Sequence, residues 1–530
     1  MRFGGMHAGG NRRVAQLLAP LLFLGVLVLA FWSASTVLSG DSTPFAYMGL
    51  LAAAGVVVLV TLKDWRRGVY LFLGWLVFED LARKYLGNNM AVYFGKDFLA
   101  AVVYISFLAA VRRREVRVVR PPFFTPLMVF MWFGVLQVFN FASGSVAFGL
   151  LGLKLYFYYV PMFFVGYALF ESEIDLRRFY SFNALMALAI GGLGIFQSIL
   201  GPTFLNPAVL QEDIRGLSTL YRTAPISGVS AYRANAIFVG AGRYADFLLL
   251  NALIVFGFSG YLLLRYRKGR MLSFTTLGVL ALAAVMSAGR GPFMWVGGSL
   301  MVGSAAFLWG APWRQREALK IIRAIPRVLL VVVLAVAGLT VAYPEAVSSR
   351  FAIYSETLMP DSPTSELAHR TFYYPLDNLM KAFLYPRWPY GHGIGTASVG
   401  LQYVSRILKI PNMNIGVESG YGNLIVELGI VGLFLWLVWT VAVALSAWRV
   451  VLKLRGTPWF PLGFMNFFYA FLLLIPMSFV SFVAYQDFIL NAYLWLLLGI
   501  LFRLPDFVLA EQAAVAAAQT AAQAAGQRRT

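Results

Sequence analysis

Cysteine is absent from this chain of 530 residues, and charged residues are scarce. The absence of cysteine excludes disulfides, iron–sulfur clusters and thiol chemistry. Only 12% of the residues are charged whereas 60% are hydrophobic, and the mean hydropathy is +0.73. Soluble globular proteins carry about 25% charged residues, so this composition predicts an all-α polytopic membrane protein.

Several chemical signatures are also missing from the sequence. No histidine or acidic residues have the spacing of a metal site, so we expect neither a metal nor another cofactor. The chain has no P-loop and no Ser–His–Asp order. The formal net charge is +20, but no soluble domain is present to display a basic face, so we expect no nucleic-acid partner. The lack of a soluble domain also argues against an enzyme that uses nucleotide sugars, because such an enzyme needs a cytoplasmic catalytic domain.

Long apolar runs are the main feature that the sequence does have. About 14 of them are long enough to cross ~30 Å of hydrocarbon as helices. We expect spans at residues 14–38, 44–63, 68–84, 94–111, 121–141, 147–170, 177–199, 237–264, 271–288, 292–310, 326–343, 421–449, 461–482 and 488–505. The first run is too long for a signal-peptide core and is interpreted as a retained membrane helix, with a secretory signal as the alternative.

The basic residues give this series of spans an orientation. Placing the N-terminus inside puts most of the 43 lysines and arginines on the inside, as the positive-inside rule requires. Both termini are then cytoplasmic, and two long loops, residues 200–236 and 344–420, lie outside. Loops of that length are uncommon and usually functional.

These loops divide the chain into expected regions. The membrane-spanning regions are residues 1–199, 237–343 and 421–508, separated by the outer loops 200–236 and 344–420. We expect the larger outer loop to be partly helical. The Ala- and Gln-rich residues 509–530 are expected to form a cytoplasmic tail, either as a frayed helix or disordered.

Several basic residues near the outer side are candidate ligands for a pyrophosphate group: Arg233, Arg243, Arg290, Arg370 and Lys154. The positive-inside rule disfavours arginine outside, and a guanidinium binds phosphate through paired hydrogen bonds. Arg290 lies in a tight turn, Ser-Ala-Gly-Arg-Gly, between two expected spans. Alternatively, such arginines contact lipid headgroups or pair with Glu212, Asp213 and Glu366, and Arg243 forms a structural pair with Asp246 near the membrane surface. Lys154 lies within a span, and its long side chain alternatively reaches the interface.

One segment resembles a known family. Residues 418–434 read ESGYGNLIVELGIVGLF, a polar start followed by a long apolar helix. This resembles the signature of the O-antigen ligase/polymerase family, in which His-Asn-Ser-Tyr is followed by Glu-Leu-Gly and a further glycine. The turn at Arg290 resembles that family's Ser-Arg-Gly motif, residues 390–396 its glycine-rich turn, and residues 370–375 its Arg-(x)3-Trp/Tyr element. The resemblance extends over residues 200–500.

The resemblance implies an enzyme on the periplasmic face of the bacterial inner membrane. We expect a metal-independent glycosyltransferase that polymerises undecaprenyl-diphosphate-linked oligosaccharide repeat units of an O-antigen or exopolysaccharide. Its partners would be that donor and membrane lipid, and the resemblance leaves open a chain-length regulator protein. One alternative is a ligase that transfers the glycan to lipid A–core, although Glu418 replaces the ligase histidine. Another is a flippase for lipid-linked glycans.

The expected chemistry assigns roles to particular residues. Arg290 would stabilise the departing diphosphate. Glu418 is suited to accept a proton from a sugar hydroxyl, or else stabilises a helix N-terminus. His392, in the glycine-rich turn, is the alternative base. The aromatic residues expected to contact the glycan, unless they only pack the loop, are Tyr373, Tyr374 and Tyr421.

Overall fold

The computed structural model describes residues 43–87, 90–207, 210, 212–218, 220–266, 268–310, 315–359, 365–367, 369–411 and 416–527. The expected span at 14–38 lies outside the described residues. The chain separates into two units. The first comprises the described residues up to Phe72 together with Leu99–Ser106, and the second comprises Leu73–Phe98 and Phe107–Thr530. Every candidate site residue belongs to the second unit.

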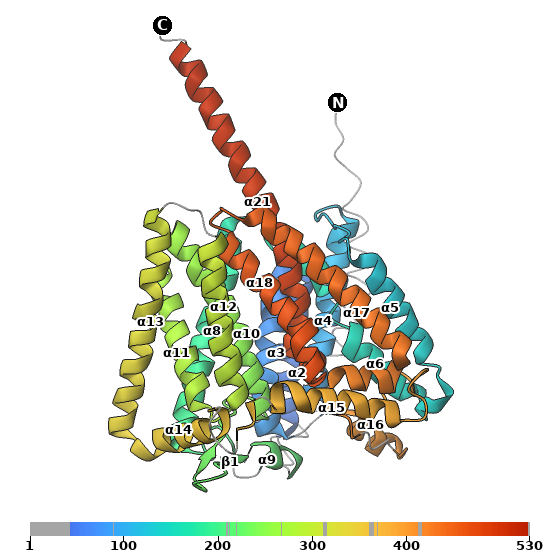
Figure 1. Ribbon diagram of the computed structural model, residues 1–530. Helices are drawn as coiled ribbons and strands as arrows, with labels where there is room; N and C mark the ends of the chain where they lie inside the picture. The colour runs from blue at the N-terminus through green and yellow to red at the C-terminus, as the bar shows by residue number, and fades with distance from the viewer. Residues whose placement is uncertain are drawn as a thin grey trace. The chain divides into compact units, whose positions relative to one another are not determined.

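The described residues form an all-α protein apart from one short hairpin (Figure 1). Eight of its helical segments are long and apolar enough to cross a membrane. They are α4 (Met90–Arg112), α6 with α7 (Val146–Phe157 and Met162–Ala168), α8 (Glu173–Leu200), α10 (Ala241–Arg265), α12 (Arg290–Gly310), α17 (Gly420–Leu454), α18 (Phe460–Leu472) with the turns that follow it, and α21 (Phe488–Gln527).

The other expected spans in the described residues fall on helices that are less apolar or have shorter apolar stretches. These are α2 (Thr43–Lys63), α3 (Trp65–Leu86), α5 (Phe124–Gln137), α11 (Arg270–Met286) and α13 (Gln315–Ala342). Helix α3 carries Glu79, Asp80, Arg83 and Lys84, all of them buried, which lowers its hydropathy. The tail after Leu509 is helical in α21 up to Gln527, because alanine is the strongest helix former.

Short elements connect the long helices. They are η1 (Phe141–Ser143), α9 (Glu212–Ser218), β1 (Tyr221–Thr223), β2 (Ser230–Tyr232), α14 (Pro344–Leu358), η2 (His369–Tyr373), α15 (Tyr374–Lys381), η3 (Ala382–Leu384), α16 (Leu401–Leu408), η4 (Leu473–Met477), α19 (Ser478–Val480) and α20 (Val483–Gln486). Figure 1 shows α9, β1, α14, α15 and α16 at one end of the helices of the second unit. We call this the loop end.

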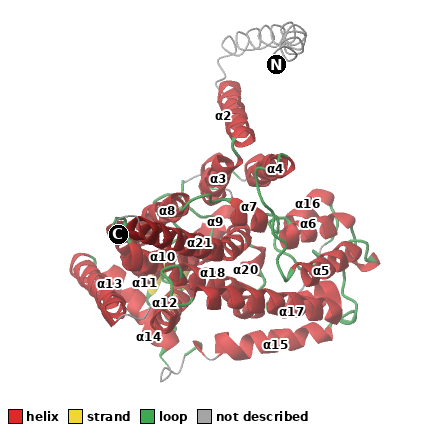
Figure 2. Cartoon of the chain, turned by 90° about the horizontal axis from the view of Figure 1, so that it is seen from above, coloured by secondary structure: helices red, strands yellow, loops and turns green. Residues whose placement is uncertain are grey.

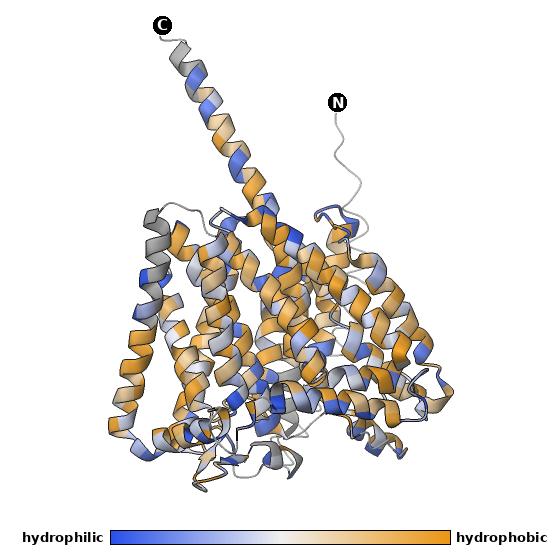
Figure 3. Cartoon of the chain, viewed as in Figure 1, coloured by the Kyte–Doolittle hydropathy of each residue, from blue (hydrophilic) through white to orange (hydrophobic). Residues whose placement is uncertain are grey.

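Helix α10 is the central helix of this unit. It is apolar around most of its circumference and is buried along most of its length, as expected for a helix surrounded by others. It packs against α8, α11, α12 and α18, and Figure 2 shows it among them. Figure 3 shows hydrophobic residues along the helices and many hydrophilic residues at the loop end. The first residues of α10 and α12 therefore face a polar region.

The segment that resembles the family signature, residues 418–434, forms the first part of α17, and α17 is broken at Gly429. This residue has φ +72°, a left-handed conformation that favours glycine. The glycine-rich segment Gly391–Gly395 packs on the break: the His392 N–H donates to Val426 O (2.8 Å) and the Gly393 N–H to Glu427 O (2.9 Å). A Cβ at Gly391 would lie 2.4 Å from Glu427 O, and one at Gly429 2.4 Å from Pro389 O. We call this contact the glycine clasp.

The side chain of Glu427 completes the clasp. Its buried carboxylate accepts hydrogen bonds from the Tyr156 hydroxyl (2.7 Å), the Ala397 N–H (2.8 Å) and the Ser398 hydroxyl (2.8 Å). Removal of this acceptor would leave buried donors unsatisfied. The Glu-Leu-Gly part of the signature therefore has a structural role here.

Substituting Gly429 tests the clasp. We expect Gly429→Ala to lower the thermal unfolding temperature in detergent, because the backbone strain and the clash with Pro389 O together cost about 1–3 kcal/mol. Gly297→Ala in α12 is the matched control, since nothing lies within 4 Å of an added Cβ there. Equal unfolding temperatures for the two variants would contradict this account of the clasp.

Candidate functional site

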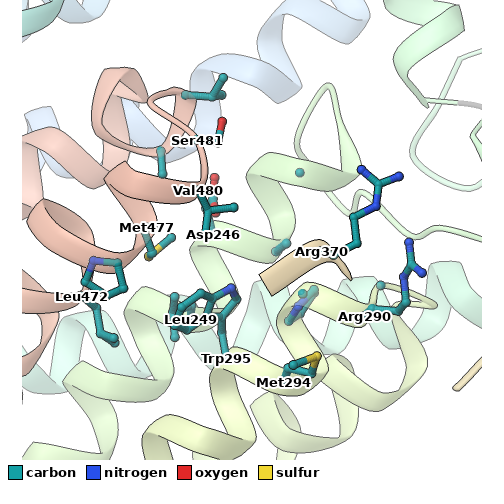
Figure 4. Close-up of a pocket in the computed structure, with 18 of the residues that line it drawn as sticks. Asp246, Leu249, Arg290, Met294, Trp295, Arg370, Leu472, Met477, Val480 and Ser481 are labelled. Carbon is teal, nitrogen blue, oxygen red and sulfur yellow. The ribbon is translucent and has the colours of Figure 1, made fainter. Parts of the chain in front are cut away.

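A cavity of about 1100 Å³ lies at the loop end of the second unit. Its walls come from the first three turns of α10 and the first four of α12, from the second half of α18 through to α20, from the β hairpin, and from residues around Glu366 and Glu418. Some of these segments are more than 200 residues apart in sequence, so only the fold brings them together. Figure 4 shows the cavity with part of its lining.

Four arginines line one part of the cavity: Arg222, Arg233, Arg290 and Arg370. Arg290 is the first residue of α12, and the turn before it is held by the Gly289 N–H, which donates to the Ser287 hydroxyl (3.2 Å). Arg222 lies in β1 and Arg233 directly follows β2. The antiparallel register, which pairs Tyr221 with Tyr232, places both at the same end of the hairpin.

This cluster has an excess of positive charge. Burial and the charges of Arg290 and Arg233 lower the pKa of Arg222 to about 10, and burial and Arg290 also lower that of Arg233. A guanidinium does not lose its proton in proteins, so these shifts indicate an unfavourable charge that an anion would relieve. The Nε of Arg233 is buried and has no hydrogen-bond partner within the described part of the chain.

Glu366 is the anionic group that now contacts the cluster. Its carboxylate forms ion pairs with Arg290 and with Arg370, the latter at 3.3 Å. Burial would raise the pKa of Glu366, but hydrogen bonds and the charges of Arg290 and Arg370 outweigh that effect and lower it. One carboxylate therefore occupies a site where guanidinium groups from two different segments converge.

The rest of the cavity is mostly apolar. Its lining includes Leu249 of α10, Trp295 and Val302 of α12, and Phe468 and Leu472 of α18. Figure 4 shows Leu249, Trp295 and Leu472 together on the side away from Arg370. A charged region joined to an apolar one suits an amphiphilic ligand with a phosphorylated head and a hydrocarbon tail.

Glu418 and Tyr374 also line the cavity. Glu418 is exposed, and its backbone N–H donates to Asn378 Oδ1 (3.4 Å). A hydrogen bond to Glu418 raises the pKa of the Tyr374 hydroxyl, with smaller contributions from burial and from the Glu418 charge. Of the residues predicted from the sequence, the fold brings Arg233, Arg290, Arg370, Glu418 and Tyr374 to one cavity.

Arg243 and Lys154 are engaged elsewhere. Arg243 forms ion pairs with Asp80 (2.6 Å) and Asp487 (3.4 Å), and Lys154 forms one with Asp97 (2.5 Å). Neither lines the cavity. Charges in an apolar environment need partners, so these pairs explain both basic residues without a ligand.

The remaining predicted residues do not line the cavity either. His392 is buried in the glycine clasp with Nδ1 3.1 Å from Val426 O. The Tyr421 hydroxyl donates to Ile475 O (3.4 Å), and its ring packs edge-on against Phe479. Tyr373 is exposed. Their roles as base or glycan contacts stay predictions.

No protein-family model and no curated protein matches this chain. The suggested family membership therefore depends on the motifs alone. Within the described ranges, no group of three or more His, Cys, Asp or Glu side chains could hold a metal ion. The charged groups that the cavity offers are guanidinium groups and carboxylates.

Arg222 and Asp246 also line the cavity, although neither is among the site residues predicted from the sequence. Arg222 has a local signal, since two short strands separated by a turn place it near Arg233. The sequence position of Asp246 suggests a structural partner of Arg243. Which carboxylate pairs with Arg243 depends on contacts between distant helices, which local patterns do not encode.

Substituting Glu366 tests the anion site. We expect Glu366→Gln to bind inorganic pyrophosphate about threefold to tenfold more tightly, because it removes a competing carboxylate whose ion pairs are worth about 1 kcal/mol. Isothermal titration calorimetry would measure the affinity. Asp377→Asn is the control, since Asp377 is exposed and pairs with Lys381 on α15. An affinity that does not change in Glu366→Gln would contradict competition at this site.

Proposed function

We propose that this protein is a glycosyltransferase of the bacterial inner membrane that polymerises oligosaccharide repeat units linked to undecaprenyl diphosphate. The observation that carries the proposal is the cavity, in which Arg222, Arg233, Arg290 and Arg370 adjoin an apolar region. A lipid-linked donor has the matching parts, a diphosphate and a long hydrocarbon chain. The resemblance of residues 418–434 to the ligase/polymerase signature supports the same conclusion.

The proposed topology places this cavity at the periplasmic surface. In it, about 14 helices cross the membrane and both termini are cytoplasmic, so residues 200–236 and 344–420 form periplasmic loops. The elements of both loops lie together at the loop end in Figure 1, which supports this arrangement. The cavity is then open to a lipid-linked donor from the periplasmic side.

In the proposed donor complex, the diphosphate displaces the Glu366 carboxylate and binds the arginines. The polyprenyl chain lies along the apolar residues of α10, α12 and α18. Arginine suits this role because its planar group donates paired hydrogen bonds to phosphate oxygens and keeps its charge. Donor binding thereby relieves the repulsion among Arg222, Arg233 and Arg290.

The reaction transfers the growing glycan to a hydroxyl of a second lipid-linked unit. The hydroxyl oxygen attacks the anomeric carbon, and the bond from that carbon to the diphosphate breaks. Undecaprenyl diphosphate leaves with the electron pair, and its new charge is stabilised by the arginines. A carboxylate of the cavity accepts the hydroxyl proton, and Glu418 is the group that the sequence predicts for it.

An elongation assay tests this function. Purified protein is incubated with a lipid-linked repeat unit, and the products are resolved by length. We expect a ladder of polyprenyl-linked chains from the wild type and a rate about 10²–10³-fold lower for Arg290→Ala, because a donor to the developing charge is lost. Arg406→Ala is the control, since Arg406 lies on α16 at the same end of the helices but does not line the cavity.

Two other outcomes would contradict the polymerase. Transfer that requires lipid A–core, with no ladder in its absence, would identify a ligase. Movement of the lipid-linked unit from one leaflet of a vesicle membrane to the other, with no transfer product, would identify a flippase.

A further inference from the structure

Asp246 lines the same cavity as the arginines. It lies in the second turn of α10, after Gly242, which also lines the cavity. Figure 4 shows Asp246 near Met477, Val480 and Ser481, with Arg290 and Arg370 on the other side. A carboxylate therefore faces the cavity from the side opposite the proposed diphosphate site.

The residue expected to neutralise Asp246 is engaged elsewhere. Arg243 lies three positions earlier in the helix but forms ion pairs with Asp80 (2.6 Å) and Asp487 (3.4 Å). Asp80 also contacts Arg83 (3.3 Å) and accepts a hydrogen bond from the Val239 N–H (3.1 Å). Asp80 and Asp487 thus hold Arg243 outside the cavity, and Asp246 makes no hydrogen bond or ion pair with any residue that the structure describes.

The other carboxylates of the cavity differ from Asp246 in this respect. Glu366 is paired with Arg290 and Arg370, and Glu418 is exposed and bonded to Tyr374. Asp246 is only partly exposed, and the side chains around it in the lining include Leu249, Met477 and Val480. An ionised carboxyl group without a partner in apolar surroundings is costly, so a ligand that donates a hydrogen bond to Asp246 would stabilise its charged form.

We propose that Asp246 is the catalytic base that accepts the proton of the acceptor hydroxyl. This inference rests on the proposed function and names its base. The hydroxyl of the acceptor sugar donates a hydrogen bond to Asp246, and its oxygen forms the new bond to the anomeric carbon of the donor. As the bond from that carbon to the diphosphate breaks, the proton moves to the Asp246 carboxylate and the electron pair leaves with undecaprenyl diphosphate.

The geometry assigns a different role to Glu418. It lies at the exposed part of the cavity beside Tyr374, where a carboxylate and a phenol together present an acceptor and an aromatic face to a sugar. Glu418 therefore binds and orients the acceptor glycan. Its removal should raise the KM for the acceptor and change kcat little, whereas removal of Asp246 should lower kcat.

The test compares Asp246→Asn with Glu418→Gln in the full-length protein. Elongation of the lipid-linked repeat unit gives kcat and KM, and binding of undecaprenyl diphosphate is measured separately by calorimetry. We expect Asp246→Asn to lower kcat about 10²–10⁴-fold while the affinity for undecaprenyl diphosphate changes less than about twofold. Formate, a small external base, should restore part of the activity of Asp246→Ala, which a purely structural residue would not show.

Each remaining outcome decides against the assignment. If Asp246→Asn elongates within about threefold of a wild type that makes a ladder, Asp246 is not the base and the polymerase stands. If Asp246→Asn also loses undecaprenyl diphosphate binding and thermal stability, and formate restores no activity to Asp246→Ala, the residue is structural. If the wild type binds undecaprenyl diphosphate but forms no ladder, the polymerase fails and the assignment fails with it. Asp377→Asn controls for removal of a carboxylate at the loop end.

Discussion

The close packing of the Gly391–Gly395 backbone against the break in α17 is the contact on which the site depends. The break at Gly429 and the buried carboxylate of Glu427 fix where the first part of α17 lies. That part contains Asn423 and is preceded by Val417 and Glu418, and all three residues line the cavity. Because backbone meets backbone there, a side chain at Gly391 or Gly429 would separate the two segments. The glycines and the glutamate of the signature therefore position the cavity wall.

A second constraint is charge balance, because buried cationic groups are paired with carboxylates outside the cavity but not fully paired within it. Within the helices, Arg243 and Lys154 are neutralised by Asp80, Asp487 and Asp97. In the cavity, the cationic groups outnumber the carboxylates that contact them, and Arg222 and Arg233 repel Arg290. Folding alone would favour balanced charge in both places. The imbalance supports the proposal that an anionic ligand binds there.

Much of the fold follows from the sequence, because a long apolar helix can be recognised from its own residues without knowledge of its long-range contacts. Every expected span among the described residues falls on one helix or on two or three consecutive helical elements. For the site, arginines on the outer side of the predicted topology were informative: Arg233, Arg290 and Arg370 do line one cavity. The pairing of Arg243 with Asp80 was not predictable, since the two residues are 163 positions apart in the sequence and only the fold brings them together. Because Arg243 pairs with Asp80 and Asp487, Asp246 is left facing the cavity. The spacing of Arg243 and Asp246 suggests a pair that the structure does not contain.

A cryo-electron microscopy structure of the protein with undecaprenyl diphosphate bound would test the proposed site directly. We expect density for the diphosphate among Arg222, Arg233, Arg290 and Arg370, with Glu366 displaced from Arg290. We also expect density for the hydrocarbon chain along α10, α12 and α18. Diphosphate density beside Arg243 or Lys154, with the arginine cavity empty, would show that the arginine cavity is not the donor site.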